Sequence, residues 1–420
     1  MIKRLFCVVN VMACACVQGH GDDAHDDHAH ELSTAPLTRE QVQLGCLPMG
    51  SGNNAHVMCN HGHSLNFRSE NLYARWMLLN SKKVSPISEA DLMMGSGSHA
   101  SMMLPDPLTP LLRASVGERV KIRVISYGPE MHDFHVHGHI WPEGNRFIDT
   151  RELMPAEVYD GAEFYAGAGA LSAIPRAGAG DWMYHCHVEP HMLSGMWGIF
   201  RVTEPGDTTG VGVDGRYPTE LPPLLGGDGQ TVDVWVVAAE VPLAVAREFD
   251  TFTSSLQSVE RLARLYIPFS DEATFRQATS STIQQMIRPQ ETTWMPWVLA
   301  LRLGTHVRVH LRNVMKEAPA SLHPHGVRYD INNDGTTPDD VAWPGGSDVV
   351  YEWTADTAGT WPMHDHARSQ ENIGRGLFSA IVVKTPEEEM RLDRDYLIIF
   401  HDFDMNWMMG MPDGAVMQGH

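Results

Sequence analysis

A cysteine flanked by two histidines is the part of this chain with the clearest potential for chemistry. In the run Tyr-His-Cys-His-Val-Glu-Pro-His-Met-Leu-Ser-Gly-Met, four residues separate Cys186 from His191, and four more separate His191 from Met196. A thiolate, two imidazoles and a distant thioether are the ligand types of a blue-copper electron-transfer site. Such a site has no use for His185 and His187, so these two residues predict a second metal site.

The alternation of a strand explains how two sites can share this run. Neighbouring residues of a strand point to opposite faces. Cys186 can therefore bind one metal ion while His185 and His187 reach into a site behind it. The peptide backbone between them would then be a short path for electrons.

Three further clusters repeat the pattern of two histidines separated by one residue. In an extended strand this spacing puts both imidazoles on one face. Together with His185 and His187, four such pairs can surround a metal cluster. The additional histidines are His132, His135 and His137 in the first cluster, His323 and His325 in the second, and His364 and His366 in the third.

On these four motifs the chain resembles the multicopper oxidases, the family that includes laccases, ceruloplasmin and cuprous or ferrous oxidases. The resemblance spans residues 67–205 and 229–385. It implies four copper ions per chain, namely one type 1, one type 2 and two type 3 ions. The implied type 1 ligands are His132, Cys186, His191 and Met196. The other implied ligands are His135 and His323 for type 2, His137, His185 and His366 for one type 3 ion, and His187, His325 and His364 for the second.

A single histidine would carry little weight, since a lone histidine is more often a surface or satisfied core residue and this chain has 23 of them. The signal lies in the motifs and their spacing. His139, which follows the first cluster, stays outside the ligand set. We expect it to form a hydrogen bond behind a ligand histidine.

Two segments of alternating character predict the fold class. Residues 116–127 and 303–314 each have a turn glycine followed by alternating apolar and polar residues, which is typical of a half-buried strand. We expect an all-β protein with two β-sandwiches, and the resemblance implies that both are cupredoxin-like Greek-key domains. These domains are expected at 67–205 and 229–386, joined by a glycine- and proline-rich linker at 206–228.

Two segments do not fit this plan directly. Residues 254–266 have apolar side chains at helical spacing and predict an inserted helix that covers a sandwich edge. Residues 387–420 form a C-terminal tail, in which 394–403 read as a strand. Too little chain follows for a further domain, so we expect the tail to pack on an existing one.

The N-terminus predicts export. Residues 1–20 have a basic start and an apolar stretch too short to span a bilayer, which is typical of a secretory signal. We expect a periplasmic or secreted protein. The sequence Val-Met-Ala-Cys at 11–14 also fits a lipid anchor.

The segment 21–66 reads as an extension that opens with a histidine- and aspartate-rich run. Such a run cannot bury a core, and it either binds metal loosely or is a solvated tether. Cys46 and Cys59 are expected to form a disulfide in an oxidising compartment. The alternative is a reduced soft-metal site formed with the nearby histidines, which are His56, His61 and His63.

The resemblance also implies a reaction and an assembly. The protein would take electrons one at a time from a small-molecule or metal-ion reductant and reduce O2 to water. Glu189 is our first candidate for the acid that supplies protons and Asp365 the second, although either could instead orient a ligand histidine. The ligand halves 132–187 and 323–366 must meet, and two-domain members of the family join them between subunits, which implies a homotrimer.

Two other functions compete with the oxidase. A copper nitrite reductase needs only a lone type 2 copper, so the paired histidines of the second region weigh against it. A copper-sequestering protein without turnover is favoured slightly by methionines, whose thioethers suit Cu(I) but which also fill cores. These methionines are Met93, Met94, Met102, Met103, Met405, Met408, Met409, Met411 and Met417.

The net charge of −21 argues against a nucleic-acid partner and would raise the local concentration of cations. A role in solubility alone explains the same charge. The family oxidises phenols, Cu(I), Fe(II) and Mn(II), and the charge and methionines tilt the prediction towards a metal ion.

Overall fold

The computed structural model divides the chain into two compact units, Met1–Asn60 and His61–His420. The structure describes residues 47–49, 56–58, 62–72, 106–167, 178–207, 220–250, 255–287 and 295–403. In the first unit, strands β1 (Leu47–Met49) and β2 (His56–Met58) pair antiparallel, with Leu47 opposite Met58. Cys46, Cys59, the histidine-rich run and all nine methionines named above lie outside the described residues.

The second unit contains two β-sandwiches, which confirms the predicted fold class. In the first sandwich, a five-stranded sheet in the order β10-β7-β12-β13-β5 faces a four-stranded sheet in the order β11-β6-β22-β3. The strands of the first sheet are β5 (Leu111–Ser115), β7 (His132–Val136), β10 (Thr150–Leu153), β12 (Gly180–Cys186) and β13 (Trp197–Thr203). Those of the second are β3 (His63–Leu65), β6 (Arg119–Tyr127), β11 (Val158–Tyr165) and β22 (Arg394–Asp402).

The second sandwich has a sheet in the order β15-β14-β17-β19 and another in the order β16-β21-β20-β18. The strands of the first sheet are β14 (Thr231–Asp250), β15 (Ser255–Phe269), β17 (His306–Asn313) and β19 (Ser347–Thr354). Those of the second are β16 (Val298–Arg302), β18 (His323–Pro324), β20 (Gly359–His364) and β21 (Phe378–Lys384).

Shorter elements complete the description. Strands β8 (Trp141–Glu143) and β9 (Arg146–Ile148) form a hairpin, and β4 (Ser69–Glu70) pairs with β14. The helices are α5 (Glu189–Ser194), α6 (Glu272–Arg276), α7 (Ser280–Ile287), α8 (Ser369–Ile373) and α9 (Pro386–Arg391), with 3-10 turns η4 (Ile331–Asn333) and η5 (Pro338–Asp340). Within the described ranges no helix has the length and apolar character needed to cross a bilayer.

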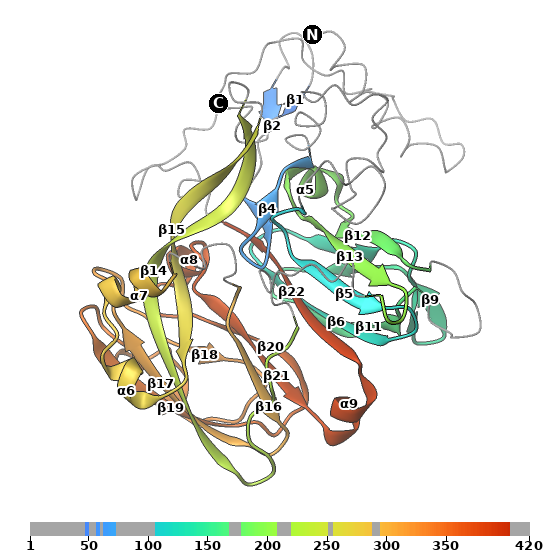
Figure 1. Ribbon diagram of the computed structural model, residues 1–420. Coiled ribbons are helices and arrows are strands. Elements are labelled where there is room, and N and C mark those ends of the chain that lie inside the picture. Colours follow the sequence, from blue (N-terminus) through green and yellow to red (C-terminus); the bar gives the residue numbers. More distant parts are fainter. Residues whose placement is uncertain are drawn as a thin grey trace, which may run out of the picture. The chain divides into compact units, whose positions relative to one another are not determined.

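The strand predicted at the end of the chain forms and completes the first sandwich. β22 pairs parallel with β6 and antiparallel with β3, so the tail packs on an existing domain as expected (Figure 1). Tyr396, Ile398 and Phe400 point into the core of the first sandwich. Leu397 and Ile399 point into a different core cluster. A strand buried on both faces reads as a continuous apolar run, which explains the sequence Tyr-Leu-Ile-Ile-Phe.

The strand β6, predicted to be half-buried, is also buried on both faces. Val120, Ile122 and Val124 line the core of the first sandwich, whereas the alternate face meets the second sandwich. On that alternate face the Tyr127 hydroxyl donates to the Ser379 main-chain oxygen and accepts from the Met363 N–H, both at 2.9 Å. In β17, by contrast, exposed and buried residues alternate along the strand as predicted.

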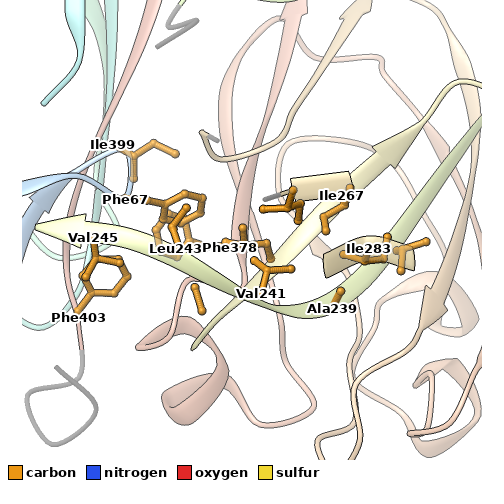
Figure 2. Close-up of a cluster of buried hydrophobic side chains, with 14 of the residues drawn as sticks. Phe67, Ala239, Val241, Leu243, Val245, Ile267, Ile283, Phe378, Ile399 and Phe403 are labelled. Atoms are coloured by element: carbon orange, nitrogen blue, oxygen red, sulfur yellow. The ribbon is translucent and has the colours of Figure 1, made fainter. Parts of the chain in front are cut away.

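The predicted helix at 254–266 is wrong, because the segment forms strand β15 instead. It pairs with β14 along a long antiparallel hairpin in which Ala263 lies opposite Val241. Ala263, Leu265 and Ile267 alternate along β15 and pack in a cluster with residues of both sandwiches, including Phe67 and Phe378 (Figure 2). Pairing with a long partner strand and burial at period two therefore outweigh the helical spacing of the segment.

Candidate metal centre

Cys186 shares a buried site with two histidines. Cys186 ends β12, His132 begins β7 and His191 lies in α5. The Nδ1 atoms of the two histidines lie 3.2 Å apart, and Cys186 Sγ lies 3.9 Å from that of His132 and 3.7 Å from that of His191. All three side chains are buried, and their donor atoms lie close enough to hold one metal ion.

Main-chain bonds close the loop that carries these ligands. The Met196 N–H donates to the His191 oxygen, and the Cys186 N–H donates to the Met196 oxygen, both at 2.9 Å. Gly195 makes the turn possible with a φ of 135°, a conformation that side chains rarely adopt. A Cβ at this position would lie 1.8 Å from Ser69 Oγ. The fully buried Met196 is thereby held next to the cysteine and histidine site.

The electrostatics of this site suit a soft metal ion. Burial, reinforced by the neighbouring His191 and His63, lowers the pKa of His132 to about 3, so its imidazole stays neutral and able to ligate. Burial raises the pKa of the Cys186 thiol to about 12, and a metal ion deprotonates such a thiol outright when it binds. The Asp133 N–H donates to Cys186 Sγ at 3.3 Å. The donor set and burial fit type 1 copper.

Behind Cys186 lies a second group of histidines. His135, His137 and His185 are close enough to share a metal site, and the Nε2 atoms of His137 and His185 lie 3.2 Å apart. β7 and β12 pair so that His135 lies opposite His185. His187 joins the group, with its ring centre 5.3 Å from that of His135.

Hydrogen bonds fix the direction of these imidazoles. His135 Nδ1 lies 2.7 Å from the Asp149 oxygen and His185 Nδ1 lies 2.8 Å from the Cys186 oxygen. Because the Nδ1–H of each ring donates to a carbonyl, each Nε2 is left as the acceptor that can bind metal. Burial lowers the pKa of His185 to about 3, although the hydrogen bond to the Cys186 oxygen opposes this shift.

The second sandwich repeats this arrangement. The Nε2 atoms of His325 and His364 lie 3.2 Å apart, and His323 lies opposite His364 across β18 and β20. His323 Nδ1 lies 2.7 Å from the Asp334 oxygen. The ring of His366 is 5.2 Å from that of His323. Burial lowers the pKa of His364 to about 4.

The two histidine groups do not meet within one chain. Each of the eight histidines contacts rings of its own group. In the described part of the chain, no ring contact or hydrogen bond joins a histidine of the first group to one of the second. Each sandwich therefore presents its own group of four histidines, in which two Nε2 atoms lie 3.2 Å apart.

His139 lies behind the first group, as expected. It is buried, with Nδ1 2.8 Å from the His137 oxygen, and its Nε2 accepts from the Gly167 N–H at 2.9 Å. Its two nitrogens are engaged in tying the His137 main chain to a neighbouring loop.

The two candidate acids differ in their surroundings. Glu189 is exposed at the start of α5. Asp365 is fully buried, and its carboxylate accepts from the main-chain N–H groups of Ser321 and Arg368 at 2.8 Å and from the Asn372 amide at 2.9 Å. Burial raises the pKa of Asp365 against these hydrogen bonds. The role of each acid stays a prediction.

Three residues that the motifs did not identify face the outer edge of the cysteine site. Glu130 lies next to His191, Asp402 next to His132, and His63 stacks on His191. Glu130 could have been noticed because it stands two residues before His132. Asp402 could not, because only the pairing of β22 with β3 and β6 brings it there.

Comparisons with known proteins agree with these sites. Two family models described as multicopper oxidase match residues 83–206 and 276–388, together more than half of the chain. A probable nitrite reductase-hydroxylamine oxidoreductase fusion protein of Kuenenia stuttgartiensis is 38% identical over 94 residues, covering 22% of this chain and 10% of that protein. Human hephaestin is 27% identical over 154 residues, covering 30% of this chain and 13% of hephaestin.

The chain thus spans less than a sixth of either curated relative. Among solved structures, Lac15 from a marine microbial metagenome is 18% identical and covers 67% of this chain and 60% of its own, with a TM-score of 0.20. The two family models, each over a sandwich with its own histidine group, show that the chain belongs to the multicopper oxidase family.

Proposed function

We propose that this copper oxidoreductase couples the one-electron oxidation of a reductant, either a phenol or a metal ion, to the four-electron reduction of O2 to water. The observation that carries the proposal is the position of Cys186 between two sites. Its sulfur faces His132 and His191, while the adjacent His185 belongs to the group of His135 and His137. Copper, when bound, supplies a one-electron acceptor at the first site and an oxygen-reducing centre at the second.

We assign four coppers to each chain. The proposed type 1 ligands are His132, Cys186, His191 and Met196. The proposed type 2 ligands are His135 and His323, and the type 3 ions are assigned to His137, His185 and His366 and to His187, His325 and His364. In each sandwich two Nε2 atoms lie 3.2 Å apart. This spacing supports the assignment of two ligands of each type 3 ion to the same sandwich.

The separation of the two histidine groups supports a homotrimer in which each complete cluster lies between copies. In one chain the groups have no contact among the described residues, although each is already arranged for metal. A second copy can supply the missing half. Sedimentation analysis of the copper-loaded protein tests this assembly, and a stable monomer with a full complement of copper contradicts it.

Nitrite reduction is disfavoured by the second histidine group. A lone type 2 copper leaves no use for the ordered pair of His325 and His364 or for the bond from His323 to Asp334. A sequestering protein without turnover has no use for the covalent path through Cys186 to His185. We also propose that the protein is exported to the periplasm or the cell exterior.

The decisive experiment combines metal analysis with turnover. Copper-loaded protein should contain four copper ions per chain and consume O2 with hydroquinone, Fe(II) or Mn(II) as reductant. Two coppers per chain together with nitrite-dependent oxidation of the reductant would favour the nitrite reductase. Full copper occupancy without consumption of O2 or nitrite would favour the sequestering protein.

A further inference from the structure

A buried arginine of the first sandwich reaches the second. Arg123 lies on the face of β6 that meets the second sandwich, and its side chain is fully buried. Its guanidinium donates to the Asp160 carboxylate at 3.3 Å and to Thr360 Oγ1 at 3.0 Å. It also donates to the two Asp395 carboxylate oxygens, at 2.7 and 2.9 Å. Asp160 and Asp395 belong to β11 and β22 of the first sandwich, whereas Thr360 belongs to β20 of the second.

Asp160 holds Thr360 with both of its carboxylate oxygens. One oxygen accepts from the Thr360 N–H at 2.8 Å and the other from the Thr360 hydroxyl at 2.5 Å. The pairing of β11 with β6 shifts register between Tyr159 and Ala162, as in a β-bulge, and bulges commonly change the direction of a side chain. The irregularity therefore explains how a residue of β11 can bind a strand of the other sandwich.

The same set of residues returns to the second sandwich at another strand. Lys384 Nζ donates to Asp395 at 2.7 Å. Lys384 ends β21, which pairs with β20 so that Thr360 lies opposite Val382. The Arg123 network, which consists of Arg123, Asp160, Thr360, Asp395 and Lys384, thus begins and ends on neighbouring strands of the second sandwich and passes through the first. Two attachment points restrict rotation more than one does.

The other end of β20 is also held by the first sandwich. β20 ends with Met363 and His364. The Tyr127 hydroxyl of β6 accepts from the Met363 N–H at 2.9 Å. The Tyr127 ring meets the His364 ring edge-on, with centres 6.1 Å apart and planes at 84°. The strand that presents His364 is therefore fixed to the first sandwich at both ends.

The chemistry of the Arg123 network suits the control of geometry. Apolar contacts already join the sandwiches, since Ile125 of β6 and Ile399 of β22 share a cluster with Phe378 of β21. Apolar packing of similar volume is often as stabilising as a buried network of charges. Unlike such packing, hydrogen bonds between charged groups require particular distances and directions. The network thus adds a defined angle to an interface that is already apolar.

The angle between the sandwiches matters if clusters form between copies. Each chain would then offer its first histidine group to one neighbour and its second group to another, and such a ring closes only at the right rotation. Thr360 and His364 are four strand residues apart, about 13 Å. A rotation of about 5° at Thr360 would move His364 by about 1 Å, several times the ~0.2 Å tolerance of metal-ligand distances.

We propose that Asp160 is a positioning residue which, through Thr360, sets the angle between the two sandwiches so that the histidine group of His364 meets the first group of a second copy. This inference rests on the proposed function. Asp160 is not among the proposed copper ligands. It acts on the assembly of the cluster and not on the cysteine site.

The first test measures copper and assembly together in copper-loaded Asp160→Ala. The type 1 copper and its blue absorption should stay at the wild-type level, because all four proposed ligands lie in the first sandwich. Sedimentation equilibrium should show that the concentration at which the trimer dissociates rises at least about tenfold, the effect of losing one hydrogen bond to a charged group. Elemental analysis of the dissociated protein should show loss of the cluster copper.

Thr360→Ser and Asp233→Ala are the controls. Thr360→Ser keeps the N–H and the hydroxyl that Asp160 binds, so it should assemble like the wild type. Asp233 resembles Asp160 in exposure, with 27% of its side chain exposed against 31%. It accepts from Arg308 at 2.6 Å and from His310 at 2.8 Å, both within the second sandwich. Asp233→Ala should therefore leave assembly and copper content unchanged.

Three results of this test overturn the proposal. The first is wild-type assembly and full cluster copper in Asp160→Ala. The second is a parallel loss of type 1 copper in Asp160→Ala, which would make Asp160 a general support of the fold. The third is an equal loss of assembly in Asp233→Ala.

The second test measures the angle in the copper-free full chain and does not depend on the proposed function. Spin labels attached through unnatural ketone side chains at Met154 and Ile331, which are 57% and 68% exposed, report the distance between the sandwiches by pulsed electron paramagnetic resonance. Asp160→Ala should broaden or shift this distance distribution, whereas Thr360→Ser and Asp233→Ala should not. An unchanged distribution in Asp160→Ala overturns the positioning role.

The two tests separate failure of the proposal from failure of the proposed function. A wild type that holds four coppers as a monomer, or that binds type 1 copper alone, contradicts the proposed assembly. The distance measurement then still decides whether Asp160 sets the angle between the sandwiches.

Discussion

His185 and His364 occupy equivalent positions in the two sandwiches. Each lies opposite a histidine of the neighbouring strand, His135 or His323, and each directs its Nδ1 to the main-chain oxygen of the next residue along the chain. Each also has its Nε2 atom 3.2 Å from that of a third histidine. The two sandwiches thus have the same arrangement of four histidines, and the first sandwich also has the cysteine site.

This duplication separates two tasks of the chain. On the proposed function, the histidine groups are alike because each would supply half of one copper cluster. The differences lie at residue 186, which is a cysteine in the first sandwich where Asp365 stands in the second. Asp365 instead uses its carboxylate to accept hydrogen bonds from the Ser321 N–H and the Asn372 amide.

Replacing the cysteine should remove the colour of the protein but not its fold. Copper-loaded wild type should be intensely blue from the bond between the Cys186 thiolate and Cu(II). Cys186→Ser should bleach this absorption, because a hydroxyl is a poor ligand for a soft site, while far-ultraviolet circular dichroism stays close to that of the wild type. A colourless wild type with full copper occupancy would contradict the assignment.

Substitution of Gly195 should damage the ligand loop. Gly195→Ala puts a Cβ in a left-handed conformation and 1.8 Å from Ser69 Oγ. Gly117→Ala is a matched control, with a φ of 90° and open space around the Cβ. We expect the control to lose about 1 kcal/mol of unfolding free energy from the backbone conformation alone. Gly195→Ala should lose clearly more, as measured by denaturant unfolding, and should also bind less type 1 copper. Equal losses would show that the loop can shift.

The buried His401 should make the stability dependent on pH. It is fully buried, and its Nε2 accepts from the Phe67 N–H at 2.9 Å. Burial lowers its pKa well below 6.5, so it is neutral in the folded protein but protonates near pH 6.5 when unfolded. The stability it contributes is therefore fully present above about pH 6.5 and is lost as the pH falls below it.

His401→Gln tests this pH dependence, since the glutamine oxygen can accept the same hydrogen bond without binding a proton. In copper-free protein, the unfolding free energy should fall between pH 7 and pH 4. The fall should be less steep for the variant, because up to one proton fewer is taken up on unfolding. Other buried histidines will maintain a part of the slope. An unchanged slope would mean that His401 does not titrate on unfolding in this range.

The parts of the fold that could be predicted are those that local patterns determine. Alternation predicted the strands of β6 and β17, and the continuous apolar run from Tyr396 to Phe400 predicted β22. The hairpin partner β15 was mistaken for a helix, because its leucines also fit a helical spacing and only the pairing with β14 decides.

The candidate site divides in the same way. The histidine motifs place their ligands on neighbouring strands, so their grouping follows from local spacing. The contact of His63 with Asp402 depends on the pairing of two strands that are more than 300 residues apart in the sequence. No local pattern contains that information.

Glu189 is our first candidate for the acid that supplies protons for O2 reduction. Glu189 lies two residues beyond His187, and in the chain it is exposed, so its carboxylate is available to a neighbouring copy or to solvent. Asp365 has its carboxylate occupied by three donors, which suits a positioning role better. Glu189→Gln should therefore slow reoxidation of the fully reduced protein by O2 at least about tenfold, the low end of what loss of a general acid costs.

Reduction of the type 1 copper, which needs no proton from the cluster, should keep its rate in the same rapid-mixing experiments. Reoxidation at the wild-type rate with full copper content would leave Glu189 as a support of His187 and make Asp365→Asn the next variant to measure.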